Sequence, residues 1–164
     1  MLDSLLRTDI RSSSLLFLRV LLGSVMLHHG LQKTLGLFGG HGFDGTMGFF
    51  TGAMGLPAPL AFLVIVAESL GAVALLFGLG TRVAAAGMVA VMAGAVATAH
   101  AGHGFFMNWT GTQGGEGFEY HLLVAGIGAV VVARGGGRLA VDGWLRARLA
   151  GSTTSAPREL APAA

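Results

Sequence analysis

The 164-residue sequence contains no cysteine and few charged residues. Without cysteine, the chain cannot form disulfides, thiolate metal sites, iron–sulfur clusters or a covalent c-type haem, and it has no thiol redox chemistry of its own. Charged residues make up 11%, against about 25% in a typical soluble domain. In contrast, 53% of the residues are hydrophobic and the mean hydropathy is +0.72. This composition indicates a membrane protein, and the length allows one small bundle.

Four apolar segments predict the fold. A membrane-spanning helix needs about 20 apolar residues, with a range of roughly 17–25. The fourth segment qualifies only if Glu119 and His121 lie at the membrane interface. A soluble helical bundle is disfavoured because the helices lack charged faces. We therefore predict an all-α fold, a membrane four-helix bundle at 14–134, with spans at about 14–37, 60–77, 83–100 and 117–133.

The basic residues predict the topology. They gather before the first span (Arg7, Arg11), in the turn after the second (Arg82) and behind the fourth, whereas the connections 38–59 and 100–116 contain none. By the positive-inside rule, both termini are cytoplasmic. Residues 1–13 then form a cytoplasmic N-terminal segment, and 135–164 form a basic, partly disordered cytoplasmic tail. The sequence pI is near 9.9, but only ten residues are basic, so we expect no nucleic-acid partner.

The first outer loop predicts a short helix. Phe43, Met47, Phe50 and Met54 repeat at helical spacing, and the pattern ends before Pro57. An apolar underside of this kind is typical of a helix lying in the membrane interface. The alternative is that these side chains roof a pocket that opens outward.

Glu68 is the only ionisable residue of the segment 60–77. An unpaired carboxylate in a membrane span is costly, so such residues mark a pathway, a site or an obligatory ion pair. With a rise of about 1.5 Å per residue, Glu68 lies about 14 Å above the inner edge and Arg19 about 8 Å above it. We therefore predict that Arg19 pairs with Glu68, either as a structural ion pair or as part of a proton relay.

One face of the first span carries a cation at each end. At 100° per residue, the side chains within an arc of about 80° are Arg19, Gly23, Met26, Gly30 and Lys33. Small residues allow close approach of a neighbouring helix or a flat ligand, which makes Gly23 and Gly30 candidate cofactor-binding residues.

Lys33 lies higher in the span, about 28 Å above the inner edge by the same rise per residue. At that level Glu119 and Glu116 are its predicted partners, and His29 lies four residues before it on a neighbouring face. All six histidines fall in the outer half or the outer loops, where they could relay protons or could simply be tolerated interfacial residues.

Three groups of residues follow one another along the chain: Arg19-x-x-x-Gly23, His29-Gly30-x-x-Lys33, and Glu68-x-x-Gly71 leading to Gly78-Leu79-Gly80-Thr81-Arg82. In their order and spacing they resemble the DoxX family of small four-span membrane proteins. The family is related to a subunit of an archaeal thiosulfate:quinone oxidoreductase. The resemblance implies a four-helix fold, a multi-pass location in the bacterial plasma membrane, and functional positions at His29, Lys33 and Glu68.

The leading functional hypothesis is a quinone-associated oxidoreductase subunit acting with a redox partner protein. His29 or Lys33 would donate a hydrogen bond to a quinone carbonyl, and Glu68 would relay protons. Haem b held by His29 and His100 is a further cofactor hypothesis, and no metal site is predicted. Two alternatives stay open: a non-enzymatic membrane scaffold or anchor for a partner protein, and a small proton or solute pathway.

Overall fold

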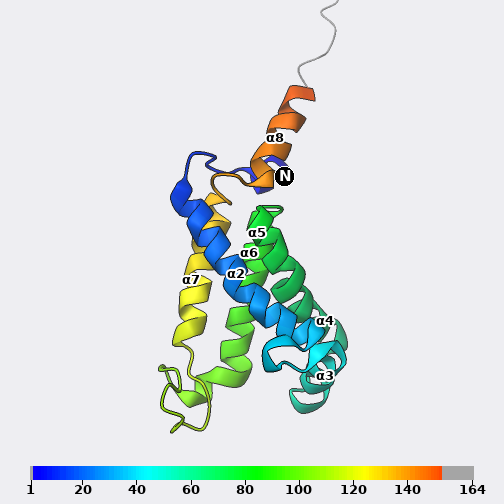
Figure 1. Cartoon of the computed structure of the whole chain (residues 1–164), viewed down its shortest axis with the longest axis vertical. Coiled ribbons are helices and arrows are strands. Elements are labelled where there is room, and N and C mark those ends of the chain that lie inside the picture. The colour runs from blue at the N-terminus through cyan, green and yellow to red at the C-terminus, as the bar shows by residue number, and fades with distance from the viewer. Residues whose placement is uncertain (1, 153–164) are drawn as a thin grey trace, which may run out of the picture.

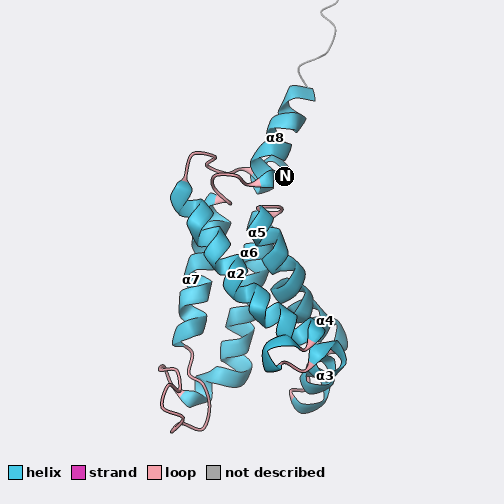
Figure 2. Ribbon diagram, in the orientation of Figure 1, coloured by secondary structure: helices cyan, strands magenta, loops and turns pink. Residues whose placement is uncertain are grey.

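A computed structural model describes residues 2–152 (Figure 1), and residue 1 and residues 153–164 lie outside the described part. The described residues form helices joined by loops (Figure 2), which confirms the predicted all-α class. The tail predicted to be partly disordered contains one helix, α8 (Val141–Ser152). Residues 153–164 of that tail lie outside the described residues.

The first long helix, α2 (Ser13–Leu35), follows the short helix α1 (Leu2–Leu6). The side chain of Ser12 accepts a hydrogen bond from the Leu15 amide and so satisfies a free N–H group of the first turn. Gly36 ends the helix with φ of +71°, a left-handed conformation that glycine adopts without steric cost. This helix corresponds to the first predicted span.

The second predicted span is one continuous helical rod, called here the 58–77 rod. It consists of α4 (Ala58–Val66), the π-helical turn η3 (Ala67–Gly71) and α5 (Ala72–Phe77). Gly78 then adopts φ of +70° and reverses the chain toward the third span.

The third and fourth segments lie side by side. The third begins with α6 (Thr81–Ala95) and continues through the π-helical turn η4 (Val96–His100) into the short 3-10 helix η5 (Ala101–His103). After a long loop, α7 (Glu119–Arg134) packs along α6. The core between the helices is apolar, with Leu22, Met26, Leu75, Met88 and Val131 among its members.

The small-residue face of α2 packs directly against the 58–77 rod. A Cβ atom added at Gly30 would lie 2.6 Å from the Cα of Ser69, and one added at Gly23 would lie 3.0 Å from the carbonyl oxygen of Ala72. A side chain at Gly30 would therefore clash with the backbone of the rod, and one at Gly23 would be tightly crowded. A ligand binding at Gly23 or Gly30 would have to displace the rod. Cofactor binding by these two glycines stays a prediction.

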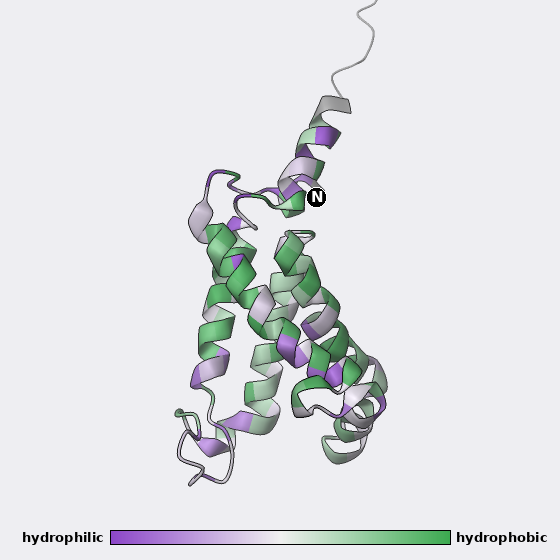
Figure 3. Cartoon of the chain, in the orientation of Figure 1, coloured by the Kyte–Doolittle hydropathy of each residue, from purple (hydrophilic) through white to green (hydrophobic). Residues whose placement is uncertain are grey.

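Among the described residues, three helical stretches are long and apolar enough to cross a membrane: Ser13–Leu35, Ala58–Phe77 and Thr81–His103. Helix α7 has 16 residues, so the four-span count and the orientation of the termini stay predictions. Hydrophobic residues predominate along the helices of the bundle (Figure 3), and many large apolar side chains are exposed, among them Phe17, Leu63 and Leu123. Such a surface suits contact with a lipid bilayer.

The loop predicted to be the first outer one contains the expected helix, α3 (Gly42–Gly48), which continues into the π-helical turn η2 (Phe49–Ala53). Both end before Pro57. Helix α3 packs against the end of α2 (Figure 1). The helix is confirmed, and its position in the membrane interface stays a prediction.

Candidate functional site

Lys33 and Glu68 form a buried ion pair at the crossing of α2 with the 58–77 rod. The Lys33 Nζ atom donates a hydrogen bond to Glu68 Oε2 over 2.5 Å. The Glu68 side chain is 6% exposed and that of Lys33 is 21% exposed. The Glu68 side chain is therefore shielded, whereas part of the Lys33 side chain is exposed at the molecular surface.

A π-helical turn carries Glu68. In the turn Ala67–Gly71 the backbone is wider than in an α-helix, and such turns occur frequently at functional sites. Ser69 fills part of the irregularity by donating its hydroxyl to the carbonyl of Ile65 over 2.6 Å. The backbone at Glu68 and Ser69 lies against Gly30, so the close helix crossing holds the carboxylate beside Lys33.

The predicted pairing of Arg19 with Glu68 is wrong. Arg19 is 1% exposed, and its guanidinium group donates to four backbone carbonyls. They are those of Leu75 (2.8 Å), Leu76 (2.6 Å), Gly136 (2.9 Å) and Arg138 (3.2 Å). Two of these carbonyls end α5, where the helix dipole places partial negative charge. Arg19 thus ties the end of the rod to the segment that follows α7.

The error in the height estimate comes from the tilt of α2. Arg19 contacts Leu75, and Gly30 contacts Ser69. Between these two contacts the chain advances eleven residues along α2 but only six along the 58–77 rod. At about 1.5 Å per residue, the distances are about 17 Å along α2 and about 9 Å along the rod. Helix α2 runs obliquely across the bundle (Figure 1), which brings Lys33 down to the level of Glu68.

Glu119, another predicted partner of Lys33, has a different role. Its carboxylate accepts hydrogen bonds from the Met107 amide (3.1 Å) and from Trp109 Nε1 (3.2 Å). Glu116 likewise accepts from the Asn108 amide over 2.7 Å. Both carboxylates therefore order the loop before α7, and the prediction that one of them pairs with Lys33 is wrong.

Tyr120 joins α7 to the site and was missed by sequence reasoning. Its hydroxyl group lies 3.2 Å from His29 Nε2 and 3.6 Å from the sulfur of Met26. His29 lies four residues before Lys33 in α2, so the two side chains are neighbours on the surface of that helix. Tyr120 is the only tyrosine of the chain, and its place at the start of the fourth predicted span was the available signal.

Two further histidines continue from Tyr120 toward the loops. The ring of His121 lies 5.5 Å from that of Tyr120 and 4.0 Å from that of His100, between centroids. His121 is 7% exposed, and its Nδ1 atom has no hydrogen-bond partner. His100 Nδ1 lies 2.9 Å from the carbonyl of Glu116.

These side chains follow one another in a row, called here the polar line. Its members are His100, His121, Tyr120, His29, Lys33 and Glu68, in that order, and the step from His29 to Lys33 is one turn of α2. Every member can bind or release a proton. His28 is not in the line, because it is exposed and its Nδ1 atom lies 2.8 Å from the carbonyl of Ser24 in its own helix.

The geometry does not fit a haem held by His29 and His100. His29 contacts Tyr120, and His100 stacks on His121. A macrocycle between the two ligands would have to displace both intervening rings. Within residues 2–152, no group of three or more His, Cys, Asp or Glu residues is arranged to hold a metal ion.

A helical bundle with apolar spans and a buried ion pair defines a class of integral membrane protein, and the comparisons identify the family. The DoxX family matches residues 14–101, so this chain belongs to the DoxX family. It is 33% identical over 112 residues to the Bacillus subtilis (strain 168) protein named "Putative oxidoreductase CatD", covering 68% of this chain and 73% of that protein. No solved structure matches the chain.

Proposed function

We propose that this chain is a quinone-associated oxidoreductase subunit of the bacterial plasma membrane, working with a redox partner protein. The observation that carries the proposal is the polar line, which runs from loop residues to the buried Lys33–Glu68 pair. The name of the Bacillus subtilis relative supports oxidoreductase chemistry. A quinone bound at the pair would accept two electrons from the partner protein and two protons.

The donor set at the pair fits a quinone carbonyl. The Lys33 ammonium group has three N–H donors and gives one of them to Glu68. Because the Lys33 side chain is partly exposed, its other donors would hold a carbonyl oxygen presented from the lipid side. Glu68 is the shielded carboxylate beside it and would relay the proton that the reaction consumes.

The rest of the line would return the proton to Glu68. His29 and Tyr120 exchange a hydrogen bond next to the pair, and His121 and His100 connect Tyr120 to the loops. On the other side of Glu68, the packed apolar residues Met26, Ala72 and Leu75 separate the pair from Arg19. A site closed at one end favours proton delivery to a substrate over a pathway through the bundle.

The test compares Glu68→Gln with Asp44→Asn, an exposed carboxylate in α3 outside the polar line. We expect quinone to co-purify with the wild type and to quench its tryptophan fluorescence on titration. Glu68→Gln should reduce quinone reduction in membranes about 100-fold, the effect typical of losing a general acid–base group. Asp44→Asn should leave the rate unchanged.

Two outcomes would contradict the proposal. One is that no quinone co-purifies and Glu68→Gln leaves quinone reduction intact. The other is that proton or solute flux in proteoliposomes depends on Glu68 while quinone reduction does not, which would identify a pathway instead.

A further inference from the structure

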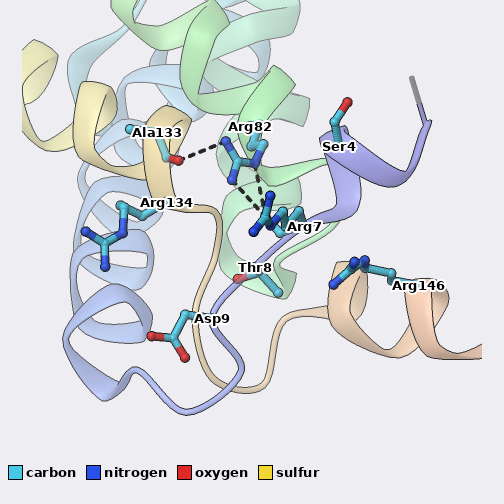
Figure 4. Close-up of a pocket in the computed structure, with 8 residues that line it drawn as sticks. All are labelled: Ser4, Arg7, Thr8, Asp9, Arg82, Ala133, Arg134 and Arg146. Atoms are coloured by element: carbon cyan, nitrogen blue, oxygen red, sulfur yellow. Dashed lines mark hydrogen bonds between the residues drawn. The ribbon is translucent and has the colours of Figure 1, made fainter.

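A second feature lies at the opposite end of the bundle from the polar line. A hollow of about 600 Å³ opens where the segment after α1, the start of α6, the end of α7 and helix α8 meet (Figure 4). Ligand pockets commonly have volumes of about 300–1,000 Å³. Each of these four segments contributes one arginine to the lining: Arg7, Arg82, Arg134 and Arg146.

Two of the four arginines are occupied by the protein itself. Arg82 donates to the backbone carbonyls of Arg7, Val132 and Ala133, so it caps the end of α7 and holds the wall of the hollow in place. Arg146 pairs with Asp3 at 2.7 Å.

The other two arginines are available to a ligand. Within the described residues, the guanidinium groups of Arg7 and Arg134 form no hydrogen bond or ion pair, and both side chains are exposed. Among the lining residues, Asp9 is the only carboxylate, and it already accepts a hydrogen bond from the Arg11 amide. The hollow therefore has an excess of positive charge, with two free planar donors that suit a phosphate group.

The surroundings favour a phosphate attached to an apolar body. The hollow lies where α6 begins and α7 ends, and both helices present apolar side chains just beyond it. Val83 is 60% exposed and Val130 is 42% exposed. Basic pockets at the cytoplasmic ends of membrane helices are typical sites for anionic lipid head groups.

We propose that this hollow binds a phosphate-bearing anion through Arg7 and Arg134, with Arg82 as the fixed wall between them. Its two sources are the head group of an anionic phospholipid and free inorganic phosphate. The site lies apart from the polar line and does not depend on the redox proposal.

The test measures binding and thermal unfolding of the full-length protein in a neutral detergent at low ionic strength. The probes are short-chain phosphatidylglycerol, short-chain phosphatidylcholine and inorganic phosphate. The variants are Arg134→Gln and the double variant Arg7→Gln/Arg134→Gln. The matched control is Arg138→Gln, an exposed arginine at the same end that does not line the hollow.

We expect phosphatidylglycerol to raise the unfolding temperature of the wild type and of the control, and phosphatidylcholine to have no such effect. Each arginine removed from the hollow should weaken the apparent Kd about tenfold, the loss expected for a hydrogen bond to a charged group. An effect of the same size with inorganic phosphate, sensitive to the same variants, would support the site and identify a soluble phosphate as its occupant.

Three results would overturn the site. The first is that neither anion shifts unfolding. The second is that the double variant binds as tightly as the wild type. The third is that Arg138→Gln loses as much affinity as Arg134→Gln, because general charge attraction would then explain the binding.

Discussion

Arg19 and Lys33 lie on the same face of α2, fourteen residues apart, and the protein uses them in opposite ways. Arg19 is fully enclosed and donates only to backbone carbonyls. Lys33 is partly exposed and pairs with the carboxylate of Glu68. A cation held by fixed carbonyls can neither lose its charge nor move, whereas an ammonium–carboxylate pair at a surface can exchange protons and bind a substrate.

The two regions also differ in what surrounds them. Near Arg19, Asp142 is 1% exposed and accepts hydrogen bonds from the amides of Gly80 and Thr81 and from the Thr81 hydroxyl. Every partner there is fixed by a turn or a helix end. In the polar line that ends at the Lys33–Glu68 pair, His121 keeps a buried nitrogen without a partner. Satisfied polar groups are typical of a structural region, and an unsatisfied buried group calls for a functional explanation.

The largest expected effect comes from Arg19. Arg19→Met should lower the free energy of unfolding by about 3–5 kcal/mol, because it leaves four carbonyls without their donor. Arg19→Lys should rescue little, since an ammonium group cannot match the planar fork of guanidinium donors. Denaturant unfolding in detergent measures both, with the exposed Arg11→Gln as control. A loss below about 1 kcal/mol for Arg19→Met would contradict a structural role.

Breaking the Lys33–Glu68 pair should cost less stability than replacing Arg19. The effects of substituting Lys33 and Glu68 should depend strongly on each other. Lys33→Met leaves Glu68 as an unpaired shielded carboxylate, and we expect a loss of about 1–3 kcal/mol, less than for a fully buried pair because Lys33 is partly exposed. The double variant Lys33→Met/Glu68→Gln should recover most of this stability without recovering quinone reduction. Recovery of both together would show that the pair is only structural.

His29 and His28 offer a neighbouring comparison of residues inside and outside the polar line. His29→Gln should slow quinone reduction up to about tenfold, as expected for losing one hydrogen bond at Tyr120. His28→Gln should have no effect, because His28 is exposed and lies against the carbonyl of Ser24 in its own helix and the Phe38 ring, outside the polar line. Initial rates in membranes measure the difference, and equal effects of the two substitutions would exclude a proton route through His29.

The smallest effect is expected at the Asp3–Arg146 pair on the surface. The hydrogen bond from Arg146 and its positive charge lower the pKa of Asp3 below its ordinary value. Because the folded-state pKa is the lower one, the stabilisation is present above the unfolded pKa of about 3.9 and is lost as pH falls through the folded pKa.

Unfolding midpoints of the wild type and Asp3→Asn should therefore differ slightly near neutral pH and converge in acid. High salt should shrink the difference, because both groups are exposed to solvent. A difference that grows as the pH falls would contradict the assignment.

Much of the bundle could be predicted from local pattern. The apolar segments, the Gly78–Gly80 turn and the helix in the first loop follow from composition, spacing and glycine, and Glu68 stands out as the only ionisable residue of its span. The partners could not be predicted so well, because the height estimate assumed parallel axes. The tilt of α2 changed which residues face each other, and α7 brought Tyr120 and His121 beside α2.

The sequence by itself determined that the protein is helical, apolar and has one carboxylate in its second apolar segment, because these properties depend on residue type and period. Only the tertiary structure decided that Lys33 and not Arg19 meets that carboxylate. The reason is that helix crossing angles arise from contacts such as Gly30 against Ser69, which join residues far apart in the chain. The same oblique crossing puts Arg19 among carbonyls and leaves Lys33 at the surface.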